Sequence, residues 1–261
     1  MTTRQLDLKA RLNDLVRLMR VEDYGTFIQL VAGYGLGGGH DLGYLAVGLL
    51  ILAPGLYGGL YALNDAHDYR ADRRHPKKAT RPVAAGRVSP RTAYMIGVGL
   101  VALSLAAALA FDRRVFVLAV LFVAFNLAYT FWLKTVPYVE IAMNTVTHAL
   151  RVAGGLWLAG SGGYGSVIAA GFLAVLAIST LKRFKELREA PIAVRPVLRY
   201  YTLERLTRLM TLSLAGVVLI LLVTTGWEQV LTGVWLMVGA GTVVGYLRVP
   251  PLRRLADRVW R

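Results

Sequence analysis

The sequence predicts an all-α, polytopic membrane protein in which a bundle of about eight helices crosses the bilayer. Three observations support this prediction. Hydrophobic residues make up 56% of the 261 residues, and the mean hydropathy is +0.52. Long apolar runs alternate with short segments that are rich in charge, glycine or proline. The formal net charge of +15 gathers in those short segments, as it does in the loops of membrane proteins.

Composition also argues against several other classes of protein. A pI near 10.4 is common in nucleic-acid-binding proteins, but long apolar segments separate the basic clusters here, so we expect no nucleic-acid partner. The chain has no cysteine, which excludes disulfides and thiolate sites. Residues 1–23 have mixed charge and no apolar core, unlike a cleaved signal peptide.

The apolar runs define the predicted spans, and the charges between them define the orientation. The first and sixth spans are short for a bilayer crossing, which takes about 20 residues. If the spans number eight, 27 of the 30 lysines and arginines fall on the side that holds both termini; the exceptions are Arg113, Arg114 and Arg151. The positive-inside rule makes that side cytoplasmic. The predicted spans are Tyr24–Gly38, Leu42–Leu63, Thr92–Ala110, Val115–Leu133, Val136–Ala159, Ser166–Leu181, Thr207–Thr225 and Val230–Leu247.

We therefore expect one membrane-embedded domain over residues 1–261, integral to the cytoplasmic membrane. Residues 1–23 form a cytoplasmic N-terminal segment, and residues 248–261 form a cytoplasmic basic tail. Within this tail, the alternation of Leu and Trp with arginines over residues 252–261 predicts a short amphipathic helix at the membrane interface.

An acidic motif stands at the predicted cytoplasmic end of the second span. It reads Asn64-Asp65-x-x-Asp68-x-x-x-Asp72. On a helix, Asp65 and Asp72 differ by about 20° and Asp68 lies about 60° away, so the three carboxylates share one face. Mg²⁺ would relieve their mutual repulsion, because it accepts a few carboxylates and completes its octahedron with water and phosphate oxygens. Asn64 would add or orient an oxygen ligand. We thus predict a magnesium site.

The segment after the motif favours a phosphate-bearing ligand. Lys77, Lys78 and Arg81 follow in a loop shaped by proline and glycine, and cations beside metal-binding carboxylates suit a phosphate clamp. In the alternative interpretation, the motif is merely a solvated helix end. Its carboxylates would then be neutralised by the arginines that follow closely, namely Arg70, Arg73 and Arg74.

The fifth span carries a polar stripe. Relative to Glu140, the side chains of Asn144, Thr147, His148 and Arg151 all fall within about 80° on a helix. Charged residues at membrane depth cost roughly 2.5–3.5 kcal/mol each unless they face a cavity or a partner. The stripe therefore either lines a cavity or forms an ion pair, between Glu140 and Arg151 or between helices, that holds the bundle together.

The motif and its loop resemble a known family. Asn-Asp-x-x-Asp-x-x-x-Asp followed by Arg81-Pro82-x-x-x-Gly86 is similar to the first signature of the UbiA superfamily of intramembrane transferases, and the span layout extends that resemblance over nearly the whole chain. The resemblance implies a UbiA-like fold and a cytoplasmic active site. Its members typically have nine helices, one more than predicted here. If a neighbouring copy supplies that helix, the protein is a homo-oligomer.

Further stretches resemble one branch of that superfamily, the decaprenyl-phosphate phosphoribosyltransferases. Prenyltransferases carry a second Asp-rich motif in the loop after the sixth helix, whereas residues 181–189 here contain no aspartate and read Lys182-Arg183-x-x-Glu186-Leu187. The resemblance implies that substrate phosphates are contacted or oriented by a set of polar residues from three regions. These are Tyr129, Lys134, Glu140, Arg151, Lys182, Arg183 and Glu186.

These residues also have simpler interpretations. Lys182 and Glu186, four positions apart, are spaced for a surface ion pair. Tyr129 is placed where an interfacial aromatic residue would stand, and Lys134 where a lysine would reach the interface with its ammonium.

The favoured function is transfer of phosphoribose from phosphoribosyl diphosphate to a polyprenyl phosphate. Asn64, Asp65, Asp68 and Asp72 would hold Mg²⁺ and, with Lys78 and Arg81, act in catalysis; Lys77 would join the substrate-binding residues. The alternative is a prenyltransferase that moves a prenyl group from its diphosphate to an aromatic, quinone-precursor or glycerophosphate acceptor. A third hypothesis is a structural or lipid-binding protein that retains only the fold.

Overall fold

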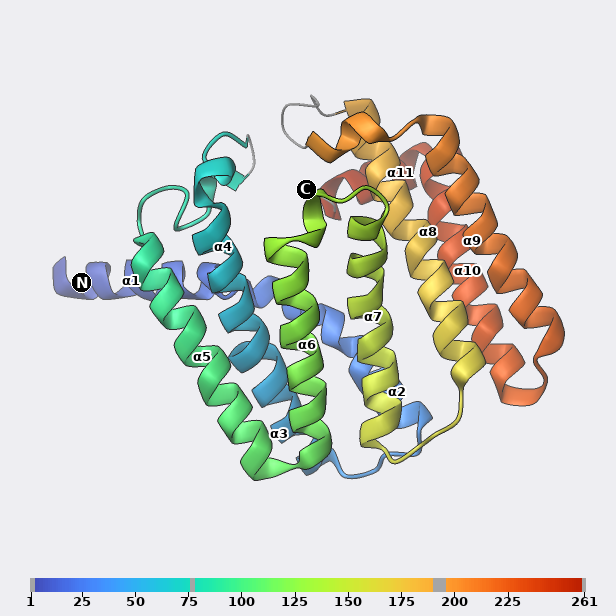
Figure 1. Cartoon of the computed structure of the whole chain (residues 1–261), viewed down its shortest axis with the longest axis horizontal. Coiled ribbons are helices and arrows are strands. Elements are labelled where there is room, and N and C mark those ends of the chain that lie inside the picture. Colours follow the sequence, from blue (N-terminus) through green and yellow to red (C-terminus); the bar gives the residue numbers. More distant parts are fainter. Residues whose placement is uncertain (1–2, 76–77, 190–195, 260–261) are drawn as a thin grey trace. The chain divides into compact units, whose positions relative to one another are not determined.

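The computed structural model describes residues 3–75, 78–189 and 196–259, with side chains described from residue 9 to residue 254 (Figure 1). Helices account for its regular structure, and no strand occurs in the described part of the chain, so the all-α prediction is confirmed. The longer helices are α1 (Thr3–Leu18), α2 (Ile28–Leu36), α3 (Leu42–Leu50), α4 (Gly58–Asp72), α5 (Pro90–Phe111), α6 (Arg113–Phe131), α7 (Val139–Leu158), α8 (Gly165–Glu189), α9 (Leu203–Val223), α10 (Gly226–Arg248) and α11 (Pro250–Val259).

Within the described residues, six helical segments are long and apolar enough to cross a membrane. One of them is the continuous run Leu42–Asp72, and the others are α5, α6, α8, α9 and α10. The predicted first span corresponds to the nine-residue α2 and the turn before it, and the predicted fifth span corresponds to α7; neither is among the six. The chain is therefore a polytopic membrane protein, and the number of eight spans stays a prediction.

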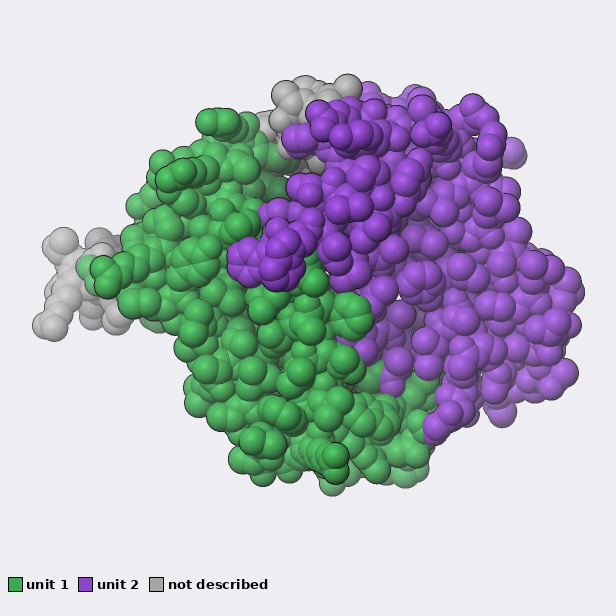
Figure 2. All heavy atoms as spheres, viewed as in Figure 1, with its two compact units in different colours: residues 1–130, 154–161 green, residues 131–153, 162–261 purple. Residues whose placement is uncertain are grey.

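The chain divides into two compact units (Figure 2). Unit 1 comprises residues 1–130 and 154–161, and unit 2 comprises residues 131–153 and 162–261. The predicted acidic motif belongs to unit 1, whereas Glu140, Arg183 and Glu186 belong to unit 2.

Unit 1 is organised around α4, the helix that carries the acidic motif. α3 continues into α4 through a π-helical stretch, Ile51–Tyr57, which contains Pro54. Proline lacks the N–H that an α-helical turn needs, which accounts for the altered winding at this point. α4 then packs closely on α5, and its Ala62 and Ala66 share a small apolar core with Leu18 of α1. This core fixes the N-terminal segment against the motif.

Unit 2 is built mainly on α8, α9 and α10, which pack on one another. Apolar contacts among Ala177, Leu181, Met210 and Tyr246 join these three helices. α8 extends to Glu189, so residues 182–189, expected as a loop after the sixth span, are helical. Ion pairs at helical spacing, Arg183 with Glu186 and Lys185 with Glu189, support this extension.

The predicted C-terminal helix also forms, as α11. Its Arg253 donates to the backbone carbonyls of Tyr246 and Leu247 at 3.1 and 2.9 Å. These are carbonyls at the end of α10 that have no partner within that helix, so the arginine caps α10.

Candidate active site

The acidic motif occupies the C-terminal half of α4. Asp65 and Asp72 are buried, with 1% and 3% of their surface exposed, and Asp68 is half-buried. Nη1 of Arg81 donates to Oδ1 of Asp65 at 3.2 Å and to Oδ2 of Asp72 at 2.6 Å. One guanidinium reaches both carboxylates, so they lie on the same side of the helix, as their spacing predicts.

A second arginine, Arg20, approaches Asp65 from the N-terminal segment. Its Nη2 donates to Oδ1 of Asp65, the same oxygen that Arg81 contacts. Burial by itself would lower the pKa of the Arg20 guanidinium, but attraction to Asp65 and the hydrogen bond outweigh burial and raise it. Oδ2 of Asp65 is buried and has no hydrogen-bond partner among the described residues. Oδ1 of Asp65 thus accepts hydrogen bonds from two arginines, whereas Oδ2 remains available to bind a ligand.

The loop after α4 brings its cations back to the motif. Nζ of Lys78 lies 3.7 Å from Oδ1 of Asp72. The loop is closed by backbone hydrogen bonds from Arg87 and Val88 to the carbonyl of Pro82, and Gly86 adopts a left-handed φ of 78°. α5 then begins at a serine cap, in which Ser89 Oγ accepts from the backbone N–H of Thr92. Lys77, predicted to join this clamp, lies outside the described residues.

The cations around Asp65 and Asp72 are not the ones expected if the motif were merely a solvated helix end. That interpretation expected Arg70, Arg73 and Arg74 as partners, whereas the described ion pairs of these two carboxylates involve Arg20, Lys78 and Arg81. Arg73 instead donates to the carbonyl of Ala84 at 3.0 Å and so supports the loop.

Asn64 lies on α4, Tyr129 lies near the end of α6, and Lys134 follows α6 in the chain. Oδ1 of Asn64 accepts from Thr130 Oγ1 at 3.3 Å, which orients the amide from α6. Tyr129, the neighbour of Thr130, is half-buried and belongs to unit 1. Lys134 is half-buried in a short 3-10 turn, Leu133–Thr135, and belongs to unit 2.

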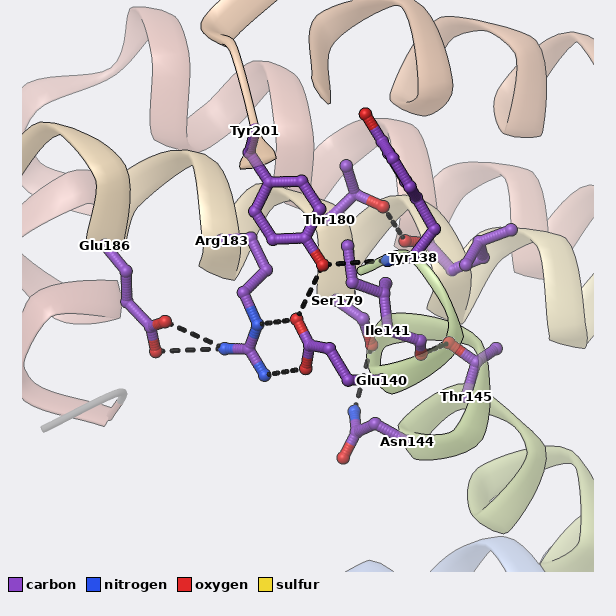
Figure 3. A network of polar contacts seen from close by, with 11 residues as sticks. Tyr138, Glu140, Ile141, Asn144, Thr145, Ser179, Thr180, Arg183, Glu186 and Tyr201 are labelled. Atoms are coloured by element: carbon purple, nitrogen blue, oxygen red, sulfur yellow. Dashed lines mark hydrogen bonds and ion pairs between the residues drawn. The ribbon is translucent and has the colours of Figure 1, made fainter. Parts of the chain in front are cut away.

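A buried polar network in unit 2 joins three of the other predicted residues (Figure 3). Nε and Nη2 of Arg183 donate to the two oxygens of Glu140 at 2.6 and 2.7 Å, and Nη1 donates to both oxygens of Glu186 at 3.0 Å. Tyr201 donates to Oε1 of Glu140 at 3.1 Å and accepts from the backbone N–H of Tyr138 at 2.9 Å. Glu140 is fully buried and Arg183 is 6% exposed.

This network decides which partner Glu140 has, a question that the sequence left open. Glu140 pairs with Arg183 of α8, which makes it an inter-helix ion pair, and Arg183 also pairs with Glu186. Arg151 is 3% exposed, and its Nη1 donates to the carbonyl of Thr147 at 3.4 Å within α7. Lys182 is exposed. In the polar stripe of α7, Glu140 therefore joins α7 to α8 through this ion pair, and its predicted role in orienting substrate phosphates stays a prediction.

The family profile described as the UbiA prenyltransferase family matches residues 26–258, nearly the whole chain. The chain belongs to this family. A decaprenyl-phosphate phosphoribosyltransferase of Mycobacterium tuberculosis is 35% identical over 168 residues, covering 61% of this chain and 54% of that protein. The enzyme of the same name from Corynebacterium glutamicum is 32% identical over 170 residues, covering 61% and 50%. The chain thus spans about half the length of these curated relatives.

Solved structures show the same UbiA fold. A UbiA homolog from Archaeoglobus fulgidus bound to GPP and Mg²⁺ superposes with a TM-score of 0.75, 17% identity and coverage of 95% of this chain and 96% of that chain. A digeranylgeranylglyceryl phosphate synthase gives a TM-score of 0.67 at 16% identity, with coverage of 96% and 92%. This UbiA family member is therefore an integral membrane protein of a transferase family.

The acidic motif of this UbiA family member fits a divalent cation in its donor chemistry. Among residues with described side chains, no three His, Asp or Glu groups converge as a complete metal site. Mg²⁺ does not require one, since it commonly takes one or two carboxylates and completes its shell with water and substrate phosphates. Among the described residues, the buried Oδ2 of Asp65 has no hydrogen-bond partner, so this oxygen is available as a metal ligand.

Sequence reasoning missed Arg20 and Tyr201. Arg20 stood among the basic residues attributed to membrane orientation, and Tyr201 stood in a segment with no recognisable motif. Each meets its acidic partner across a long stretch of chain, 45 residues for Arg20 and 61 for Tyr201. No local spacing signals either contact.

Proposed function

We propose that this protein is a Mg²⁺-dependent transferase that moves phosphoribose from phosphoribosyl diphosphate to a polyprenyl phosphate. One observation carries the proposal: the 35% identity over 168 residues with a protein named decaprenyl-phosphate phosphoribosyltransferase. The end of α8 supports it. Where prenyltransferases are expected to have a second aspartate motif, this chain places Arg183 between Glu140 and Glu186.

The donor's diphosphate is assigned to the acidic motif and its loop. Asn64, Asp65, Asp68 and Asp72 would hold Mg²⁺, which when bound supplies positive charge against the leaving diphosphate. Arg20 and Arg81 occupy Oδ1 of Asp65, which would leave Oδ2 as the oxygen that binds the cation.

Lys78 and Arg81 complete this half of the proposed mechanism. Both already lie at the carboxylates, Lys78 at 3.7 Å from Asp72 and Arg81 in contact with both buried aspartates. They would stabilise the negative charge that develops on the departing diphosphate as the ribose carbon gains oxocarbenium character. Lys77, adjacent in sequence, is proposed to join them.

The acceptor is assigned to basic residues of unit 2, namely Lys134, Arg151 and Lys182. Tyr129 of unit 1 is proposed as a further substrate-binding residue. A polyprenyl phosphate is already an anion near neutral pH, so its attack on the ribose carbon needs no dedicated general base. Glu140 and Glu186 would act by fixing Arg183. Three of its nitrogens already donate to these carboxylates, so Arg183 presents a fixed positive charge.

We further propose that both termini and the active site face the cytoplasm, in a single functional domain of the cytoplasmic membrane. Only three of the 30 lysines and arginines fall outside the predicted cytoplasmic segments, and this asymmetry supports the orientation.

A prenyltransferase is the second candidate function. It is favoured by the likeness in fold to the Archaeoglobus fulgidus homolog whose structure holds GPP and Mg²⁺. In that case the cations around the acidic motif would hold a prenyl diphosphate, and Lys182 and Arg183 would take the place of the second set of aspartates.

Diphosphate release by the purified protein in detergent tests these alternatives. One reaction contains Mg²⁺, phosphoribosyl diphosphate and a polyprenyl phosphate, and a matched reaction contains a prenyl diphosphate and an aromatic acceptor. We expect release only in the first, with phosphoribose attached to the lipid product. Release only in the second would overturn the proposal in favour of the prenyltransferase.

A further inference from the structure

Unit 1 contains a cavity of about 320 Å³ beside the acidic motif. It lies between the turn that follows α1 and the loop that follows α4. Six of its seven lining residues are polar or charged: Arg17, Arg20, Glu22, Asp23, Thr80 and Arg81. Two of these, Arg20 and Arg81, are the arginines that hold Asp65, so the cavity adjoins the proposed diphosphate site.

Three arginines line the cavity, and contacts within the protein hold two of them, Arg20 and Arg81, in place before any ligand binds. Arg20 has a φ of 50°, a left-handed backbone conformation that is uncommon for a residue other than glycine. This turn places its guanidinium 4.9 Å from the centre of the Tyr61 ring and in contact with Asp65, one helical turn further along α4. Arg81 is held by Asp65 and Asp72. Fixed guanidiniums lose little freedom when they bind a phosphate.

Two carboxylates in the cavity lining limit which ligands it can bind. Glu22 and Asp23 are exposed and line the same cavity. They would repel a bare anion, but they accept hydrogen bonds from hydroxyl groups. Guanidiniums with carboxylates and the Thr80 hydroxyl therefore suit a phosphorylated polyol. Pro82 is the single apolar residue in the lining, which does not suit a prenyl chain.

We propose that this cavity binds the sugar-phosphate end of the donor. Arg17 and Arg20 contact the ribose 5-phosphate group, and Glu22 and Asp23 accept from the ribose hydroxyls. This inference rests on the proposed function and deepens it, because it adds a recognition site for the half of the donor that is not the leaving group. The N-terminal segment thereby determines specificity for a sugar donor over a prenyl donor.

The test measures binding of ribose 5-phosphate to the full-length protein in nanodiscs of phosphatidylcholine. This probe has the sugar and its phosphate but lacks the diphosphate. We expect Arg17→Gln to weaken its binding about tenfold or more, the loss of one charge-assisted contact. Arg91→Gln is the matched control, because Arg91 is an exposed arginine on α5 that does not line the cavity. Its affinity for the probe should equal that of the parent.

A second comparison tests the hydroxyl contacts. The parent should bind ribose 5-phosphate more tightly than 2-deoxyribose 5-phosphate, and the double variant Glu22→Gln/Asp23→Asn should lose most of that preference. Equal binding of the two sugars by the parent would overturn the assignment of the carboxylates.

The remaining outcomes separate this inference from the proposed function. If phosphoribosyl transfer occurs but Arg17→Gln changes neither probe affinity nor the KM for phosphoribosyl diphosphate, the cavity assignment fails and the function stands. If the parent binds the probe but transfers no phosphoribose, the function fails instead. If nanodiscs that contain phosphatidylglycerol abolish probe binding, the phosphate recognised there belongs to a lipid headgroup, and the assignment to the donor is wrong.

Discussion

Arg183 donates two parallel hydrogen bonds to Glu140, from Nε to Oε1 at 2.6 Å and from Nη2 to Oε2 at 2.7 Å. The Glu140 side chain is fully buried and that of Arg183 is 7% exposed. Two desolvated charges in this geometry depend on each other, since either one alone would be a buried charge with a missing counter-ion. The pair therefore ties α7 to α8 within unit 2, whatever contact its members make with substrate.

Glu140→Gln should destabilise the protein strongly. The substitution leaves the Arg183 guanidinium buried with Glu186 as its remaining carboxylate partner in the described network, and breaking a buried pair costs about 3–5 kcal/mol. Thermal unfolding in detergent measures the loss. Glu204→Gln is the control, because Glu204 forms an exposed pair with Arg208 whose contribution is about 0–1 kcal/mol. Equal losses for the two variants would contradict this account of the network.

Asp68→Asn should abolish Mg²⁺-dependent turnover while leaving the fold intact. Asp68 is half-buried, so the amide is tolerated, but it is a weaker ligand for Mg²⁺ than a carboxylate. Loss of a residue that merely hydrogen-bonds to a metal ligand can lower activity roughly 100-fold, and loss of a ligand itself should lower kcat by more than this. Diphosphate release at varied Mg²⁺ measures this fall. Asp14→Asn is the control, because it removes the carboxylate that pairs with Arg87 and lies outside the acidic motif. Retained turnover in Asp68→Asn would remove Asp68 from the metal site.

The fold was largely predictable from the sequence because bilayer-spanning helices have a strong local signal. The predicted span Thr92–Ala110 differs by two residues or fewer at each end from α5, Pro90–Phe111. The signal weakens where a helix is polar. Residues 182–189 were expected to form a loop because their charges end the apolar run. In the structure α8 continues to Glu189, and ion pairs along the helix stabilise this extension.

The candidate site was predictable only where its residues are close in sequence. The spacing of Asp65 and Asp72 places them on one face of α4, and Arg81 lies within reach of both. Arg20 was missed because its contact with Asp65 depends on the left-handed turn after α1 and on the packing of α1 against α4. Tyr201 was missed for the same reason, since tertiary packing alone brings it to Glu140.

Tyr201→Phe should reduce stability in a pH-dependent way. Burial raises the pKa of the Tyr201 hydroxyl; the Tyr138 N–H opposes this shift, and the nearby Glu140 carboxylate adds to it. A raised pKa means that the folded state holds the proton more tightly, so this stability is complete below about pH 10 and declines above it. Phenylalanine has no such proton. The parent should therefore exceed the variant in unfolding temperature near neutral pH, and the difference should narrow above about pH 10. A constant difference across this range would show that the hydroxyl does not titrate in the way its surroundings imply.

Gly97→Ala should lower both the unfolding temperature and the activity, because Gly97 is where α5 meets α4. A Cβ at this position would lie 2.7 Å from Leu63 and 2.9 Å from the carbonyl oxygen of Gly59, and both belong to the helix that carries the acidic motif. Overpacking of this kind costs about 1–3 kcal/mol, against a gain of up to about 1 kcal/mol from replacing glycine in a helix.

Gly99→Ala provides the control for this contact. Gly99 stands two residues further along α5, and a Cβ there would meet nothing within 4 Å. We expect its unfolding temperature to be unchanged or slightly higher than that of the parent, with full diphosphate release. If Gly97→Ala behaves like Gly99→Ala in both measurements, α4 does not depend on close approach by α5, and another contact must hold the acidic motif in place.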